Sequence, residues 1–276
     1  MEITREILPE VIKRRKQKTH KGNYGRVVIL AGDNYMGGAA ILATKACVFS
    51  GAGLTTLITS PKNFQPLHAH VPESMVCDWT DFDTIQSLLS RAAILLIGPG
   101  LGQTDQAKHV FQFCMERIRP HQIVILDGDG LSLFKDLHIS LSTPENMIFT
   151  PHQQEFSSLT GLEIAEQTTP AVQKIVDEMK VHIVLKSSRT EIFHPHRPSS
   201  FITNGTPAQA TGGMGDTLAG MIAGFHAQFK DPIQTLHAAV FLHSHIASSI
   251  SRNEYVSLPS KMILEIPAMM SHFEGN

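Results

Sequence analysis

Short apolar runs recur along the chain, and residues that interrupt a strand follow them. Val27–Leu30 is continuously apolar and leads into Ala31-Gly32, a pattern typical of a strand buried on both faces. Comparable runs lie at Leu54–Thr59, Ile94–Ile97, Ile123–Leu126, Met147–Thr150 and His182–Lys186. Segments with helical spacing separate several of them, at Gly38–Gly51, Gln106–Arg117 and Ala171–Met179. This alternation predicts an α/β fold with a mainly parallel central sheet and helices on both faces.

The last third of the chain has a different character. Glu191–His194 and Ser200–Thr203 flank a proline-containing turn and are predicted to form a hairpin. After Gly212 the pattern predicts helices at Asp216–Phe229, Pro232–Ser251 and Met262–Phe273, with no strand between the first two. The 276 residues contain no linker, repeat or low-complexity tract, so we expect a single domain spanning residues 1–276.

Polar and glycine-rich segments follow several of the predicted strands. The carboxyl ends of parallel strands share one edge of a sheet, and ligands of α/β proteins bind beyond that edge. We therefore expect a site there, built from residues 31–33, 98–102, 127–129, 150–152 and 186–188.

The segment Thr211–Gly220 contains Gly212, Gly213 and Gly215 directly before a predicted helix. Backbone N–H groups at such a helix N-terminus favour an anion, and Asp216 stands where it would face a group held there. This arrangement favours phosphoryl transfer to a hydroxyl, with Asp216 accepting the proton. The same pattern also fits a tight turn followed by a first-turn acid.

Charge and composition narrow the classes of protein to which the chain can belong. The formal net charge of −2 and the isolated basic run Lys13–Lys16 favour a solvated helix face over a nucleic-acid site. No apolar stretch is long enough for a membrane span, and the N-terminus does not resemble a signal peptide. The three cysteines are widely separated, which indicates a reducing cytoplasm, and the i, i+2 histidine pairs are weak zinc candidates.

The chain resembles the ribokinase-like superfamily, whose members carry a Gly-x-Gly-Asp anion hole with a catalytic aspartate. Within it, the chain is most similar to the NAD(P)H-hydrate dehydratase family. The matching pieces run nearly end to end and are residues 25–32, 35–40, 50–56, 72–75, 97–102, 126–131, 150–152, 185–186 and 210–216. The segments Gly51-Ala52-Gly53-Leu54-Thr55 and Ile97-Gly98-Pro99-Gly100-Leu101-Gly102, in this order, are far more specific than a lone glycine loop.

The resemblance implies a carbon–oxygen lyase that repairs nicotinamide cofactor. Hydrated NADH or NADPH in the S form carries a hydroxyl on C6 of the ring. Bacterial members of this kind phosphorylate that hydroxyl with ADP and then eliminate phosphate, giving NAD(P)H, AMP and phosphate. The resemblance further implies Mg²⁺ as cofactor and a homotetramer.

The resemblance also assigns roles to individual positions. Asp216 is implied as the base, lying near the bound hydrate, and Glu155 as an acid that organises Mg²⁺ through water. The remaining positions are implied to bind nucleotide (Lys186, Ser187, Ser188, Arg189, Thr190, Gly213, Gly215) or hydrate (Ala39, Gly102, His152). The chain departs from the family at Ser187-Ser188-Arg189, at Met214 and at Gln153-Gln154.

Other readings of these residues stay open. The glycine hole and Asp216 would equally serve an ATP-dependent kinase acting on a vitamin precursor or sugar. A nicotinamide-dependent oxidoreductase would use residues 98–102, although their spacing does not match Gly-x-Gly-x-x-Gly. A nucleotide-binding regulator without turnover is a further possibility. Lys186 also fits an ion pair with a neighbouring acid, and His152 a helix cap.

Overall fold

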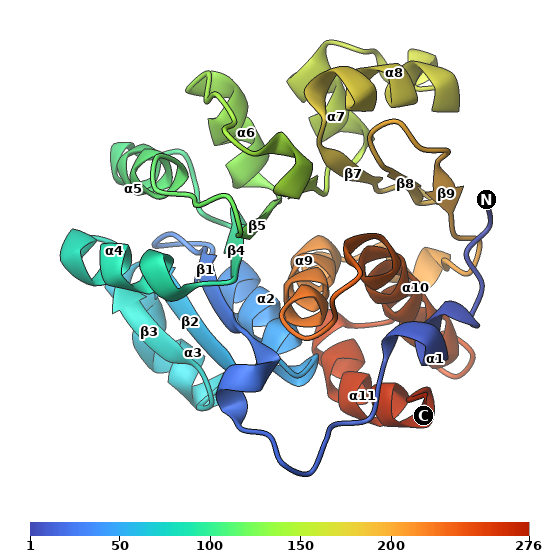
Figure 1. Ribbon diagram of the computed structural model, residues 1–276, viewed down its shortest axis with the longest axis horizontal. Helices are drawn as coiled ribbons and strands as arrows, with labels where there is room; N and C mark the ends of the chain where they lie inside the picture. The colour runs from blue at the N-terminus through green and yellow to red at the C-terminus, as the bar shows by residue number, and fades with distance from the viewer. Residues whose placement is uncertain (276) are drawn as a thin grey trace.

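The computed structural model describes residues 1–275 and joins nine strands into a single sheet (Figure 1). The order across the sheet is β3-β2-β1-β4-β5-β6-β7-β8-β9, with β1 to β7 parallel and β8 and β9 antiparallel. The strands are β1 Arg26–Leu30, β2 Leu54–Thr59, β3 Met75–Asp78, β4 Ile94–Ile97, β5 Ile123–Leu126, β6 Met147–Phe149, β7 His182–Leu185, β8 Glu191–Phe193 and β9 Ser200–Phe201. The predicted α/β class, the mainly parallel sheet and the hairpin are confirmed.

Helices cover both faces of the sheet because successive strand residues point to opposite sides. Val27 and Ile29 belong to one buried cluster, and Val28 and Leu30 belong to the other. The first cluster lies under α1 Ile7–Val11, α2 Gly37–Phe49, α3 Phe64–His70, α9 Met214–His226, α10 Pro232–Ile250 and α11 Pro259–His272. The second lies under α4 Phe82–Arg91, α5 Asp105–Met115, α6 Asp129–Asp136, α7 Gln153–Thr160 and α8 Thr169–Met179.

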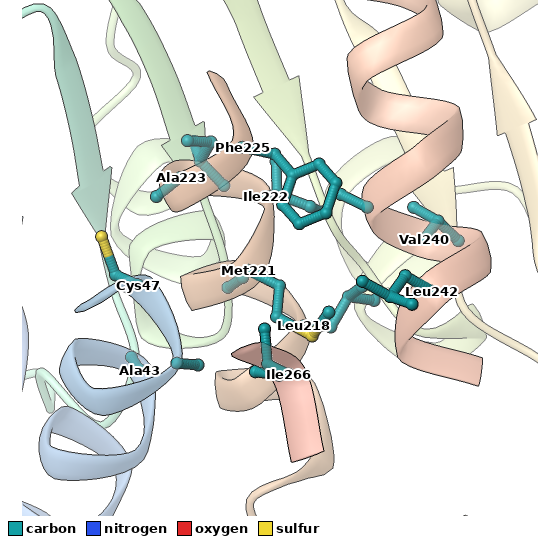
Figure 2. Close-up of a cluster of buried hydrophobic side chains, with 14 of the residues drawn as sticks. Ala43, Cys47, Leu218, Met221, Ile222, Ala223, Phe225, Val240, Leu242 and Ile266 are labelled. Atoms are coloured by element: carbon teal, nitrogen blue, oxygen red, sulfur yellow. The ribbon is translucent and has the colours of Figure 1, made fainter. Parts of the chain in front are cut away.

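Helix α9 lies at the centre of the first cluster and is buried on all sides after its first turn. Figure 2 shows its Leu218, Met221 and Phe225 among side chains of α2, α10 and α11. Gly224 allows the close approach to α2, because a Cβ there would lie 2.6 Å from the carbonyl oxygen of Cys47. This packing fixes the N-terminus of α9 relative to the sheet.

Several elements are absent from the sequence prediction. Strand β3 was missed because it is short and Met75 at its start is exposed, so it lacks the apolar run of a central strand. Helices α1, α3, α4, α6 and α7 were also missed, since each is short and α6 begins within the Asp127–Asp129 turn. The helix face expected at Lys13–Lys16 is wrong, because α1 ends at Val11 and Lys13 forms an isolated β-bridge with Gly275. Helix α9 starts at Met214, which places Asp216 inside its first turn.

The neighbouring strands β1 and β4 form the point where the strand order reverses. The helix after β1, α2, packs on one face, and the helix after β4, α5, packs on the other. Ligands of doubly wound sheets bind in the crevice that such a reversal opens at the carboxyl ends of the strands. Within the described chain, no helix has the length and apolar character needed to cross a membrane.

Candidate active site

The glycine-rich segment forms the N-terminus of α9. Gly213 is the N-cap residue and has a φ of 91°, a left-handed conformation that an L side chain rarely adopts. It brings no side chain to cap the helix, so the N–H groups of the first turn keep their capacity to bind an anion. The side chain of Thr217 donates back to the Gly213 carbonyl at 2.9 Å and steadies the turn. The predicted anion hole is thus present in the backbone.

Lys186 follows β7 and reaches into a group of carboxylates. Its Nζ lies 2.8 Å from Oδ1 of Asp127 and 3.9 Å from Oε2 of Glu155. Asp127 is only 3% exposed, and Thr150 donates to the same Oδ1 at 2.7 Å. Burial opposes the charge on Lys186, but Asp127, Glu155 and Asp216 together raise its pKa above the ordinary value. The lysine is therefore charged and held in place.

This ammonium lies against the anion hole. A Cβ built on Gly215 would approach Nζ of Lys186 to 3.2 Å, so the backbone of the first turn of α9 and the cation are neighbours. Backbone amides and a positive charge converge on one position, where a phosphoryl group is stabilised both by hydrogen bonds and by charge.

Asp216 stands beside this position with an altered acidity. Burial, followed by the negative charge of Asp127, raises its pKa to about 6, while Lys186 pulls it downward and Asp129 and Glu155 add to the rise. A carboxylate with a pKa just below neutral is largely ionised at pH 7 and is a better proton acceptor than an ordinary aspartate. The residue has the properties that a general base requires.

The loops after β1 and β4 meet in a region that contains Gly102 and borders Ala39 at the start of α2. A Cβ on Gly102 would lie 2.8 Å from Oδ2 of Asp33, and one on Gly100 would lie 2.9 Å from Cβ of Ala39. The Gly102 amide donates to Oδ2 of Asp129 at 2.8 Å. This contact ties the loop after β4 to the loop after β5, beside Asp127.

His152 follows β6, but in the structure it caps α7. Its Nδ1 accepts from the amides of Gln154 and Glu155 at 3.1 and 3.2 Å, and its own amide donates to Oε2 of Glu155 at 2.7 Å. The side chain is 53% exposed, with Nε2 3.6 Å from Oε1 of Glu155. His152 therefore lies at the rim of the site, and Glu155 is shared between this cap and Lys186.

The segment Ser187–Thr190 forms a tight exposed turn beyond Lys186. The Ser187 hydroxyl donates to the Arg189 carbonyl at 2.8 Å, and the Arg189 amide donates back to that hydroxyl at 3.2 Å. Thr190 donates to the Ser187 carbonyl at 3.3 Å. The carbonyl of Ser188 lies near Gly205, and the guanidinium of Arg189 stacks 3.7 Å from the ring centre of Phe201. The arginine is thus positioned by the hairpin.

The site offers carboxylate oxygens to Mg²⁺ but no complete set of protein ligands for it. Among residues 1–275, no three His, Cys, Asp or Glu side chains form a group able to hold a metal ion. Mg²⁺ commonly keeps several waters and binds through one or two carboxylates together with substrate phosphates. Asp127 and Glu155, with oxygens facing the position next to Lys186, fit that kind of binding.

The sequence placed residues 127–129 at the expected site but gave Asp127 and Asp129 no individual role. The Asp127-Gly128-Asp129 turn indicated either a structural or a ligand role, and the pattern alone could not identify Lys186 as the partner of Asp127. Asn63 was also missed, although its side-chain amide donates to the carbonyls of Gly32 and Asp33 and holds the loop after β1. Such contacts between distant loops leave no local pattern.

Known proteins of the same kind match nearly the whole chain. The family model described as NAD(P)H-hydrate dehydratase matches residues 27–268. An ADP-dependent (S)-NAD(P)H-hydrate dehydratase of Lactococcus lactis is 44% identical over 99% of each chain. One of Staphylococcus aureus is 41% identical over 99% of each chain.

Solved structures agree with this assignment. A ribokinase-like protein of Enterococcus faecalis superposes with a TM-score of 0.97 at 42% identity, covering 99% of this chain and 96% of that one. An ADP/ATP-dependent NAD(P)H-hydrate dehydratase of Bacillus subtilis, co-crystallised with ATP and Mg²⁺, gives 0.88 at 28% identity, covering 99% and 98%. With its ribokinase-like fold, the chain belongs to the NAD(P)H-hydrate dehydratase family.

Proposed function

We propose that this protein dehydrates the S form of hydrated NADH and NADPH at the expense of ADP, giving NAD(P)H, AMP and phosphate. The observation that carries the proposal is the convergence of the α9 amides, the Lys186 ammonium and the Asp216 carboxylate on one position. A phosphoryl group held by the first two lies beside a base able to activate a hydroxyl.

The first step is a phosphoryl transfer. The amides of Gly213 and Gly215, together with Lys186, would hold the terminal phosphoryl group of ADP. Asp216 removes the proton of the C6 hydroxyl, whose oxygen forms a bond to the terminal phosphorus as the bond to the bridging oxygen breaks. AMP leaves with that oxygen and its electron pair. Stabilisation of the phosphoryl oxygens and positioning supply most of the rate in such reactions.

The second step is an elimination. The ring nitrogen lone pair expels phosphate from C6, which leaves with the C–O electron pair. Water then takes a proton from C5, and the C–H electron pair forms the ring double bond as the nitrogen regains its lone pair. Phosphate is a far better leaving group than hydroxide, so phosphorylation explains why a kinase-like site can serve a dehydratase.

Mg²⁺ would complete the site with the nucleotide phosphates, held by Asp127 and by Glu155, directly or through water. Bound there, it would neutralise phosphate charge and polarise the transferred group. The nucleotide would extend past Ser187, Ser188, Arg189 and Thr190, and the hydrate past Ala39, Gly102 and His152. The support for these assignments is the nearness of each segment to Lys186 or to the loop after β4.

The test is recovery of reduced nicotinamide absorbance from chemically hydrated NADH with Mg²⁺ and ADP or ATP. Asp216→Asn is expected to bind ADP but lose at least about 10²-fold in turnover, the low end for a general base. Asp83→Asn, which changes an exposed first-turn acid of α4 that contacts none of the site residues, is the matched control. Near wild-type turnover in Asp216→Asn would exclude that residue as the base. A stable phosphorylated product without NADH would favour the ATP-dependent kinase.

We further propose that the protein works as a homotetramer in the cytoplasm. The side chains of Leu258 and Leu264, at the start and in the middle of α11, are exposed apolar groups that an oligomer could cover. Cys47, Cys77 and Cys114 are buried free thiols, and burial raises the pKa of Cys47 and Cys114 to about 12. Light scattering on a sizing column tests the oligomer, and a monomer would contradict it.

A further inference from the structure

A large cavity lies at the end of α9 opposite the anion hole. Its volume is about 1020 Å³, and it is bounded by the C-terminal ends of α2 and α9, by α11 and by the N-terminal segment 10–24. Gln228, just beyond α9, lines it, whereas none of the residues assigned to the active site does. A cavity of this size can enclose a small organic molecule.

One part of the cavity wall is apolar, whereas most of the other lining residues are polar or charged, with five basic side chains against the acids Glu10, Asp231 and Glu274. Val48 and Phe49 from α2, Phe229 after α9, and Pro267 and Met270 from α11 all contribute apolar side chains to the lining. Water gains little in such surroundings, because each ordered water needs polar partners. This part of the wall therefore suits the apolar body of a ligand.

Two hydroxyl groups in the lining have no partner. Ser50 and Thr235 are fully buried, and among the described residues their side-chain oxygens make no hydrogen bond. A buried hydroxyl without a partner is unfavourable, and it is relieved when a ligand or water supplies one. Both oxygens lie behind the cavity surface, so a ligand reaches them only where the walls move apart.

The rim carries the basic run singled out in the sequence. Arg15 is committed to structure, since it donates to the Gly51 carbonyl and to Gln228 and lies 3.8 Å from the ring centre of Tyr24. Arg14 lies 3.9 Å from Glu274, and Lys13 donates to the Pro9 carbonyl.

Two further lysines line the rim without such commitments. Lys16 and Lys230 are exposed, and neither ammonium makes an ion pair within residues 1–275. The acid nearest Lys230 in sequence, Asp231, accepts from the amides of Ile233 and Gln234 as the cap of α10. The two ammonium groups are therefore available to an anion.

We propose that this cavity is a second binding site, which takes an organic anion with an apolar body and a carboxylate, sulfonate or phosphate head. The apolar body lies against Val48, Phe49 and Phe229. The head meets Lys16 and Lys230 at the rim. The site is separate from the proposed reaction, so either can fail without the other.

The probe is 8-anilinonaphthalene-1-sulfonate, which joins an aromatic body to an anionic head. We expect saturable fluorescence enhancement with one site per chain, reversed by dodecanoate and unaffected by ADP or NADH. Lys16→Glu and Lys230→Glu should each weaken binding about fivefold or more, since each replaces an attractive charge with a repulsive one. Lys18→Glu, two residues beyond the basic run and outside the lining, is the matched control and should bind as the wild type does.

A second variant tests the apolar wall. Val48→Trp adds bulk at the half-buried end of α2 and should abolish probe binding while the thermal transition is retained. Dehydratase turnover without probe should be unchanged in the lysine variants. Binding that does not saturate, displacement by ADP, or equal affinity of Lys16→Glu and Lys18→Glu would overturn the proposal. Absence of binding to the wild type, as when a second copy of the chain fills the cavity, would overturn it too.

Sedimentation with phosphatidylglycerol vesicles distinguishes a membrane surface from a free organic anion as the ligand of this cavity. A free organic anion predicts that the protein stays in the supernatant when these vesicles are sedimented. Lys16-dependent sedimentation with vesicles, without binding of the soluble probe, would replace the proposal with a lipid surface.

Discussion

The pH dependence of the reaction tests the environment of Asp216 most directly. Burial and the nearby Asp127 raise the pKa of this carboxyl to about 6, and only the ionised form can accept a proton. At pH 5, one unit below that pKa, the ionised fraction and kcat/KM should be about tenfold below their plateau. An aspartate with its ordinary pKa near 4 would be almost fully ionised at pH 5 and would give no visible loss.

The fall of kcat/KM toward low pH is the acidic limb of the profile. The variant Asp129→Asn tests whether this limb reports Asp216. Asp129 helps to raise the pKa of Asp216, and its Oδ2 accepts from the Gly102 amide. Asparagine keeps a carbonyl acceptor for that amide but removes the negative charge. The limb of the variant should therefore move to lower pH, with a smaller loss at pH 5. The comparison is needed because the terminal phosphate of ADP also titrates near pH 6.

The assay is AMP release, measured by chromatography in short time courses from pH 5 to 8, because reduced nicotinamide itself decays in acid. Circular dichroism at each pH confirms that the protein is still folded. A profile that is flat down to pH 5, or a limb that stays in place in Asp129→Asn, would refute the assignment of this limb to Asp216.

Other predictions concern stability. Lys186→Met leaves a buried carboxylate unpaired and should lower the free energy of unfolding by about 3–5 kcal/mol in urea titrations. The control Lys261→Met removes an exposed ion pair and should change the free energy of unfolding by less than about 1 kcal/mol. Equal losses in the two variants would contradict the argument. Gly213→Ala forces a side chain into a left-handed turn and should lower the melting temperature and raise KM for ADP, while Gly212→Ala, with open space around it, should do neither. Burial lowers the pKa of His194 to about 3, so between that value and 6.5 the unfolded chain binds the proton more readily and stability falls as the pH falls. From pH 7 to pH 5 the free energy of unfolding should fall by about 2 kcal/mol. His194→Phe should show a smaller pH dependence in the same urea titration.

The central part of the fold could be predicted because its strands are buried on both faces. A run such as Val27–Leu30 is apolar at every position, which few other structures require, and the glycine or aspartate that follows marks its end. Strand β3 lies at the edge of the sheet with Met75 exposed, so its sequence carries no comparable signal. Short helices such as α7 depend on a cap and on tertiary contacts, which periodicity over a few residues cannot reveal.

The part of the site whose residues lie close together in sequence could be predicted. The glycines and Asp216 lie within one turn, so their relation follows from helix geometry. The partner of Lys186 was not predictable in this way, because Asp127 is distant in sequence and meets it only through the order of β5, β6 and β7. His152 was expected in the hydrate pocket, with a helix cap as the alternative, and the structure shows the cap contacts with α7. Its contact with the hydrate stays a prediction.

The charges of the site also bear on the need for a metal. Asp127, Glu155, Asp129 and Asp216 together outnumber the single ammonium of Lys186, and the raised pKa of Asp216 reflects its burial first and that negative excess second. A nucleotide would bring further negative charge to the same place, which amides and one lysine offset only in part. The residues themselves therefore favour a nucleotide that arrives with Mg²⁺. By the same electrostatics, the acidic limb of kcat, which reports the bound complex, should lie above that of kcat/KM, because the nucleotide brings more negative charge than one Mg²⁺ would offset and so opposes ionisation of Asp216.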